Sequence, residues 1–135
     1  MAKYFKIAFS LFLVTVALAA CKKDFPVDED GLLITGRQEC YVSNFEIVGT
    51  DFQPVRPAGV TTVIDTTAQT INYTVLFGTD LKNVYPQFTL ASDCKLDPKI
   101  TGKVDFSDLT KPKTWTVISG NRQIRKPYTV IVKYQ

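Results

Sequence analysis

The sequence predicts an all-β domain. Short stretches rich in Thr and β-branched residues alternate apolar and polar side chains with a period of two, as expected of half-buried strands. Turn-forming residues separate these stretches, and no segment after residue 21 shows the 3.6-residue period of an amphipathic helix. About six to seven strands in one domain-sized chain favour an antiparallel β-sandwich of immunoglobulin-like type.

The start of the chain has the organisation of a lipoprotein signal peptide. Two lysines precede an apolar run over residues 7–17, which is shorter than the roughly 20 residues of a membrane-spanning helix. The small residues of Leu18-Ala19-Ala20 then lead directly into Cys21. We therefore expect residues 1–20 to be removed and Cys21 to be acylated. The alternative is an ordinary secretory signal without acylation.

Acylation of Cys21 would anchor the protein in the outer membrane, at the cell surface or on the periplasmic face. Residues 21–36 then form a charged tether, and residues 37–135 form the sandwich domain. The net charge of +3 includes two lysines of the leader, so the rest of the chain is nearly neutral. This balance does not favour a nucleic-acid partner.

Two further cysteines, Cys40 and Cys94, lie in the predicted domain. In an exported protein such a pair suggests one disulfide, and two free buried thiols are an equally good interpretation. The chain has no His, so the pair lacks the partners of a zinc site. The sequence predicts no metal and no cofactor.

The first strand is predicted from Cys40 onward, with a buried face formed by Tyr41, Ser43, Phe45 and Ile47. Strands over residues 60–65 and 70–77 follow, and the second of them has the apolar face Ile71, Tyr73, Val75 and Phe77. Another apolar run over residues 81–90 contains Pro86. A proline there predicts an irregular entry or an edge position.

The last third of the chain predicts a β-hairpin. Residues 114–118 place Trp115 and Val117 on one face, and residues 128–134 alternate in the same way. Ser119-Gly120-Asn121 between them are residues that tolerate positive φ. We expect Trp115 and Tyr128 to pack in the core, because both alternate with Thr. The alternative is that they form, with Tyr85, an exposed aromatic platform on which sugar rings stack, and of the three Tyr85 is the best candidate for exposure.

Catalytic residues are not predicted. The absence of His removes the commonest general base and the usual catalytic triads. Several Asp residues could in principle supply a glycosidase pair, but none has a spacing that selects two of them. The chain is therefore not expected to be an enzyme.

Basic residues concentrate near the end of the chain. All 13 acidic residues precede residue 109, whereas six of the 16 basic residues follow it. In the hairpin these charges would raise the local positive potential and contact an anionic partner, or they would neutralise neighbouring carboxylates in the sheet. The predicted ligand contacts are Tyr85, which adjoins Pro86, and the hairpin residues Arg122, Arg125 and Lys126.

Several motifs in the final forty residues resemble one known group of proteins. They are Leu96-Asp97-Pro98-Lys99-Ile100, Gly102-Lys103-Val104-Asp105-Phe106-Ser107, Trp115-Thr116-Val117, Ser119-Gly120-Asn121 and Tyr128-Thr129-Val130. The progression is similar to the C-terminal half of small immunoglobulin-like modules in surface lipoproteins of Bacteroidota. The resemblance implies a β-sandwich lipoprotein of a family without assigned function, often found near glycan-uptake systems. The chain departs from it at Cys94 and in lacking an acidic residue before Gly120.

Two functions follow as hypotheses. The first is a membrane-anchored, non-catalytic accessory module that binds a polysaccharide at the cell surface. The second is a structural spacer or assembly partner for another protein of an envelope complex. The resemblance slightly favours glycan binding.

Overall fold

The computed structural model describes residues 25–135, so the predicted signal peptide and Cys21 lie outside the described residues. Leu33–Gln135 form one compact unit. Among the described residues before it, Asp28 forms a tight turn in which its Oδ1 accepts hydrogen bonds from the backbone N–H groups of Asp30 (3.0 Å) and Leu32 (2.9 Å). No helix in residues 25–135 is long and apolar enough to cross a bilayer.

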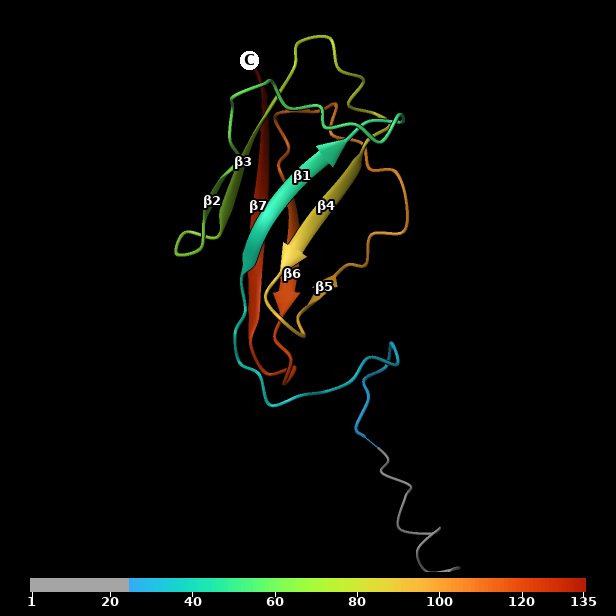
Figure 1. The fold of residues 1–135 in the computed structure, drawn as a ribbon, viewed down its shortest axis with the longest axis vertical. Helices are drawn as coiled ribbons and strands as arrows, with labels where there is room; N and C mark the ends of the chain where they lie inside the picture. Colours follow the sequence, from blue (N-terminus) through green and yellow to red (C-terminus); the bar gives the residue numbers. More distant parts are fainter. Residues whose placement is uncertain (1–24) are drawn as a thin grey trace, which may run out of the picture. The chain divides into compact units, whose positions relative to one another are not determined.

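Seven strands form the domain (Figure 1). They are β1 (Val42–Val48), β2 (Val63–Asp65), β3 (Thr70–Val75), β4 (Tyr85–Leu90), β5 (Lys95–Asp97), β6 (Lys113–Ile118) and β7 (Arg125–Tyr134). β1 and β4 form a two-stranded sheet, and the other five form a sheet of order β2-β3-β7-β6-β5. The predicted all-β sandwich is confirmed. β5 was not distinguished in the sequence because three residues are too few to show an alternation.

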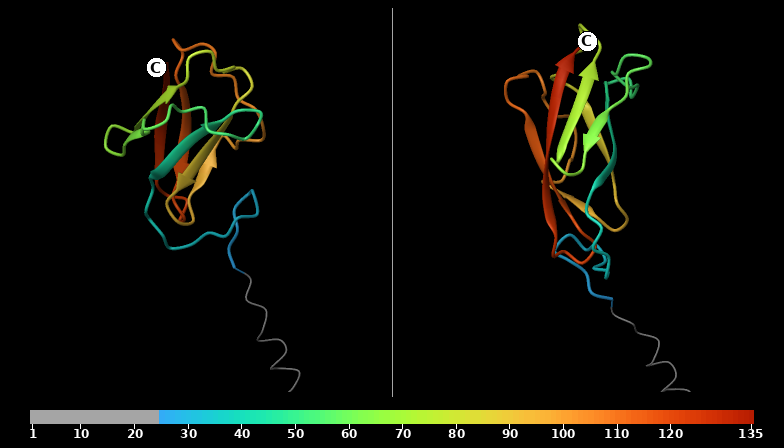
Figure 2. Two further views of the ribbon diagram at one scale, coloured as in Figure 1. Left: turned by 45° about the horizontal axis from the view of Figure 1, so that its top comes forward. Right: turned by 90° about the vertical axis from the view of Figure 1, so that its left-hand side faces the viewer.

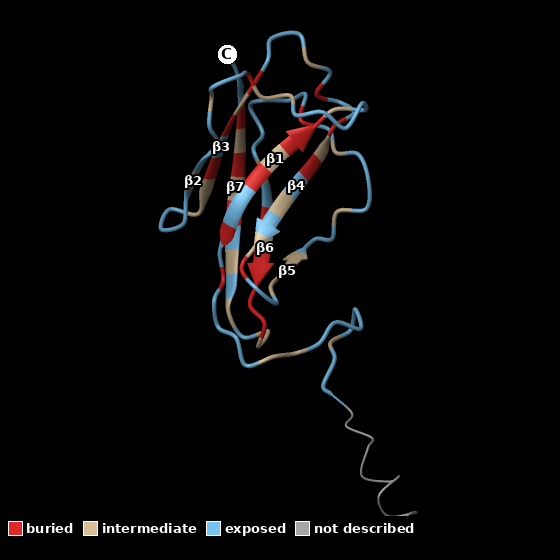
Figure 3. Cartoon of the chain, in the orientation of Figure 1, coloured by how far each residue is buried: buried red, intermediate tan, exposed pale blue. Residues whose placement is uncertain are grey.

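The two sheets face each other, as the rotated views show (Figure 2). Buried residues gather on the facing surfaces of β1, β3, β6 and β7 (Figure 3). The ring of Phe45 in β1 packs against Tyr73 in β3 and Phe88 in β4, and Phe88 in turn packs against Trp115 in β6. Trp115 and Tyr128 are both buried, so the core prediction for them is confirmed.

The predicted buried face of β1 is wrong in its first half. Tyr41 and Ser43 are exposed, whereas Val42 is buried together with Phe45 and Ile47. The cause is an irregularity in the pairing with β4, which passes from Val42 opposite Leu90 to Asn44 opposite Thr89 and leaves Ser43 as an extra residue. A bulge of this kind shifts the alternation by one position.

β3 ends earlier than predicted. Ile71, Tyr73 and Val75 are fully buried, but Phe77 lies beyond the strand and is 86% exposed. β3 pairs with β7 in parallel, whereas the other strand pairs are antiparallel. Parallel neighbours need a long connection, and here the chain visits the opposite sheet as β4 before it returns.

The edge position predicted for Pro86 is confirmed, because β4 has β1 as its one neighbour. The predicted hairpin is also confirmed, since β6 and β7 pair antiparallel from Lys113 opposite Val130 to Ile118 opposite Arg125. The positive φ of its loop falls on Arg122 (62°) instead of on residues 119–121.

Gly120 serves close packing in this loop. A Cβ there would overlap Thr35 Oγ1 and lie 3.0 Å from the Cβ of Asp93 and 3.1 Å from the Cβ of Arg37. The backbone N–H of Thr35 donates to the Gly120 carbonyl at 2.9 Å. A glycine is needed here because another backbone segment passes against it.

Candidate functional site

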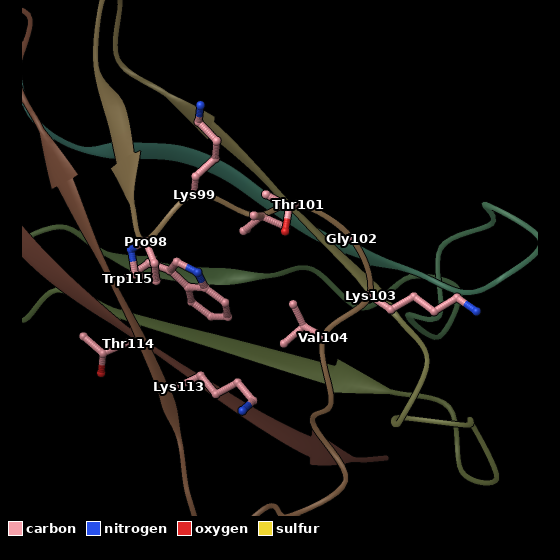
Figure 4. A pocket seen from close by; sticks show the side chains of 10 residues that line it. Pro98, Lys99, Thr101, Gly102, Lys103, Val104, Lys113, Thr114 and Trp115 are labelled. Carbon is pink, nitrogen blue, oxygen red and sulfur yellow. The ribbon is translucent and has the colours of Figure 1, made fainter. Parts of the chain in front are cut away.

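The candidate site is a cleft beside the first half of β6. We call it the tryptophan cleft (Figure 4). Its volume is about 380 Å³, within the usual range of small-ligand sites. It is lined by Pro98, Lys99, Ile100, Thr101, Gly102, Lys103, Val104, Lys113, Thr114 and Trp115.

The cleft exists because β5 covers only part of β6. The ladder between these strands runs from Lys95 opposite Ile118 to Asp97 opposite Thr116. The next residue is Pro98, which has no N–H with which to continue the ladder. The chain then departs and is held at Val104, whose N–H donates to the Val84 carbonyl at 2.8 Å. The residues of β6 before Thr116 therefore border an open space.

The floor of the cleft is rigid and partly apolar. The indole of Trp115 packs against Phe88, with ring centroids 5.3 Å apart, and against Phe106 at 6.0 Å. It is only 5% exposed, so it presents a small part of its surface to the cleft. Ile100 and Val104 add aliphatic surface on the facing segment. Such a floor can contact the C–H face of a sugar ring.

Three lysines surround this floor, and none of the lining residues is Asp or Glu. The side chains of Lys99, Lys103 and Lys113 extend from the backbone around the indole in different directions (Figure 4). Within residues 25–135 none of the three forms an ion pair. No local sequence pattern marks Lys99 or Lys103 as site residues, because only the departure of the chain after β5 places them in the same cleft as Trp115.

Asp105 is a carboxylate close to this site. Hydrogen bonds from the side chain and the backbone N–H of Ser107 hold its pKa below the ordinary value, and the charges of Lys82 and Lys113 lower it further. Asp105 is therefore ionised at neutral pH. The negative charge of Asp105 therefore partly neutralises the positive charge of Lys113.

The sequence-predicted contacts do not form one site. Tyr85 begins β4, at the end of the sandwich opposite the β6–β7 turn that contains Arg122 (Figure 1). The Arg122 guanidinium donates to the carbonyl oxygens of Leu33, Asp93, Ser119 and Gly120, so it fastens the turn. Arg125 forms an exposed ion pair with Asp97 (3.7 Å).

Lys126 belongs to a second, wider concavity of about 710 Å³. It is lined by Gln38, Glu39, Cys40, Tyr41, Thr66, Thr67, Gln69 and Lys126. Burial raises the pKa of the Cys40 thiol, and the charge of Lys126 opposes that rise. Cys40 and Cys94 are both free thiols in the structure.

Tyr85 has a partner that sequence analysis missed. Its ring stacks on Phe52, with centroids 5.2 Å apart and an interplanar angle of 22°. Phe52 adopts a positive φ of 59° in the loop after β1 and is 65% exposed. The pair forms a small aromatic surface outside the tryptophan cleft. No local sequence pattern brings residues 52 and 85 together.

The described residues offer no metal site: no three His, Cys, Asp or Glu side chains of residues 25–135 gather closely enough to hold an ion. Hydrogen bonds from nearby side chains lower the pKa values of Asp80, Asp105 and Asp108. A glycosidase acid needs the opposite shift.

Comparison with known proteins shows a family. Residues 50–132 match the model described as SGBP, N-terminal, which represents the N-terminal part of glycan-binding proteins. That match includes β2 to β6, most of β7 and the whole tryptophan cleft. No curated protein matches the chain.

Two solved structures share the fold. One is a candidate glycoside hydrolase from Bacteroides thetaiotaomicron, with 27% identity, a TM-score of 0.52 and 72% of this chain covered. The other is a DUF4623 family protein from Bacteroides eggerthii, with 19% identity, a TM-score of 0.52 and the same coverage. This chain spans 25% and 22% of their respective lengths.

Proposed function

Because this chain belongs to the SGBP N-terminal family, we propose that it is a non-catalytic accessory module that binds a polysaccharide at the cell surface. The family match over residues 50–132 is the observation that carries this proposal. The tryptophan cleft supplies a place for the contact, because it lies wholly within the matched residues.

The chemistry of the cleft suits a sugar. Trp115 and the aliphatic side chains offer an apolar surface for a ring face. The hydroxyls of Thr101 and Thr114 and the lysine ammonium groups can hydrogen-bond to ring substituents. Small-molecule sites commonly combine such an apolar floor with a few polar groups.

The same chemistry favours binding over catalysis. No carboxylate lines the cleft, so it lacks the pair that flanks a scissile glycosidic bond. The chain also has no His to act as a base. The candidate glycoside hydrolase among the similar structures is about four times longer than the shared part, so the activity in its description is that of a longer protein.

Acylation of Cys21 would hold such a module on the outer membrane and fits the envelope location of glycan-binding proteins. We expect intact-mass measurement of the membrane-extracted protein to show a start at Cys21 with attached acyl chains. A chain that begins elsewhere, without lipid, would contradict the anchor and leave the binding proposal in place.

Polysaccharide binding is tested with the full chain in mild detergent, by migration in native gels that contain a panel of neutral and acidic polysaccharides. Trp115 is the chain's one tryptophan, so its fluorescence reports directly on occupancy of the cleft. We expect retardation by at least one polysaccharide and a saturable change in emission with its oligosaccharides. Free migration in every gel would refute glycan binding.

The stacked Phe52–Tyr85 pair is an alternative contact surface. If it binds sugar, Phe52→Ala and Tyr85→Ala lower the affinity together, because either change removes half of the stack. Phe77→Ala is the control, since Phe77 is an exposed aromatic residue elsewhere on the surface. Loss of binding in these variants with an unchanged Trp115 response would move the site to the pair.

A structural role is the second candidate. The chain spans a quarter or less of the two solved structures named above, so in those proteins the fold occurs as one part of a longer chain. As a spacer or assembly partner it would co-purify with another envelope protein in stoichiometric amounts and bind no polysaccharide. Recovery as a monomer from gently solubilised membranes would count against this role.

A further inference from the structure

The positive charge of the tryptophan cleft indicates which class of polysaccharide it binds. Resting on the proposed function, we infer that the cleft binds an anionic polysaccharide, one whose sugars carry carboxylate or sulfate groups, and that Lys99 and Lys103 contact these groups. The inference concerns the described domain alone.

The tryptophan cleft brings three lysines together, and no carboxylate lines it. Elsewhere in residues 25–135 some basic side chains pair with carboxylates: Arg37 with Asp93 (3.2 Å), Arg56 with Glu46 (3.1 Å), Lys111 with Asp108 (3.8 Å) and Arg125 with Asp97 (3.7 Å). Lys82, Lys126 and Lys133 form no ion pair within the described residues, but they do not share one cleft. Two of the basic residues near the end of the chain, Lys111 and Arg125, are thus paired with carboxylates, which agrees in part with the interpretation that these charges neutralise neighbouring carboxylates. The three cleft lysines form no such pair.

The three cleft lysines differ in whether a carboxylate lies nearby. The charge of Asp105 interacts with Lys113 and with Lys82, which lies outside the cleft. Lys99 and Lys103 lie on the segment that follows β5, and no carboxylate lines the cleft beside them. A ligand anion is therefore expected to meet these two ammonium groups first.

Lysine suits an anion held at variable positions along a polymer. Its ammonium is a compact charge with three donors on a flexible four-carbon stem, so it can turn toward a carboxylate or a sulfate without a fixed fork geometry. Its stem can also turn to add aliphatic surface beside a bound sugar ring.

A neutral glycan fits this cleft less well. Covering Lys99 and Lys103 with an uncharged sugar would remove water from two ammonium groups without supplying a counter-charge. An anionic sugar instead replaces that water with charge-assisted hydrogen bonds, which are about twice as strong as neutral ones. The cleft therefore selects against neutral chains as well as for anionic ones.

The test compares polymers that share a backbone. We expect the full chain to bind dextran sulfate but not dextran, or polygalacturonate but not its methyl ester. The double variant Lys99→Glu with Lys103→Glu should lose at least about tenfold in affinity, since each charge-assisted contact is worth roughly a factor of ten. Wild-type affinity should fall when NaCl is raised from about 50 to about 500 mM.

Lys133 provides the matched control. It is an exposed lysine on β7 outside the cleft, so Lys133→Glu paired with Lys82→Glu, at another exposed lysine outside the cleft, makes the same change in net charge. This control should retain most of the affinity. Thermal unfolding of each variant, followed by circular dichroism, separates lost binding from lost folding.

The outcomes distinguish this inference from the proposed function. Binding of neutral polymers that survives the Lys99→Glu, Lys103→Glu change refutes the anionic ligand and leaves glycan binding intact. An equal loss in the control variant overturns the assignment to the cleft. Failure to bind any polymer removes both ideas, and binding to anionic phospholipid vesicles alone would replace the polysaccharide by a membrane surface.

Discussion

The hydroxyl of Tyr73 in β3 donates a hydrogen bond to the Glu46 carboxylate in β1, so one contact joins the two sheets. Glu46 also accepts a hydrogen bond from Arg56 Nη2 at 3.1 Å. The Tyr73 ring is fully buried beneath this contact and meets Phe45 edge-on. The arrangement places a small polar network at the margin of an otherwise apolar interface.

Tyr73→Phe removes the inter-sheet hydrogen bond and keeps the ring. We expect the free energy of unfolding, measured by urea denaturation, to fall by about 1–2 kcal/mol, because the Glu46 carboxylate loses a donor in a partly buried place. Tyr134→Phe is the control, since Tyr134 is partly exposed at the end of β7 and should change stability little. Equal effects of the two changes would refute a role for the network.

Alkaline pH should destabilise the domain. Burial, and then the hydrogen bond to Glu46, raise the pKa of Tyr73 well above its ordinary value of 10.0, and burial also raises the pKa of Tyr128. Both groups are neutral in the fold and ionise more easily when unfolded. Their stabilisation is therefore fully present below about pH 10 and is lost progressively as the pH rises above that value.

This pH dependence is measured by urea denaturation between about pH 8 and pH 11. In Tyr73→Phe the decline should be shallower than in the wild type, since one of the two tyrosines no longer contributes. A stability that stays constant up to pH 11 would show that neither hydroxyl changes its ionisation on folding.

Gly120→Ala tests the close approach of residues 35–37 to the hairpin turn. The new Cβ would overlap Thr35 Oγ1 and crowd two neighbouring Cβ atoms, so we expect a loss of about 1–3 kcal/mol in urea denaturation. Gly36→Ala is the control, because a Cβ at Gly36 meets nothing within 4 Å. Similar stabilities for the two variants would exclude packing as the reason for glycine at position 120.

Cys40 and Cys94 are predicted to form a disulfide under oxidising conditions. They are free thiols in the structure, where the Cys40 thiol donates to the Val117 carbonyl (3.2 Å) and the Cys94 thiol donates to the carbonyl of Glu39, the neighbour of Cys40 (3.0 Å). Non-reducing peptide mapping should recover the linked peptides, and dithiothreitol should lower the stability by roughly 4 kcal/mol in the chain-entropy model. The variant Cys94→Ser should be insensitive to dithiothreitol. Full alkylation of both thiols in air-oxidised protein would contradict the bridge.

Local patterns predicted much of the fold. The alternation in residues 128–134 follows from the strand period alone, and so does the burial of Trp115, Val117 and Tyr128. The same rule gave the wrong face for Tyr41, because the bulge at Ser43 depends on how β1 pairs with β4. A period of two describes one strand and carries no information about its partner.

Local sequence patterns could not predict which residues form the candidate site. The predicted contacts Tyr85, Arg122 and Lys126 were chosen by residue type, and the structure distributes them over separate surfaces. Lys99 and Lys103 reach Trp115 because β5 stops after three residues and the chain then crosses toward Val84. The charge left in the cleft depends on which carboxylates lie nearby, and that is a property of the assembled sheets.

The amino-acid order alone thus established the class of fold, the hairpin and the large side chains of its core, because each depends on contacts or alternation within a few residues. The bulge in β1, the parallel pairing of β3 with β7, the contact between Gly120 and Thr35 and the tryptophan cleft became visible in the folded domain. Each of these joins segments distant in the chain, and their meeting is set by the packing of the two sheets against each other.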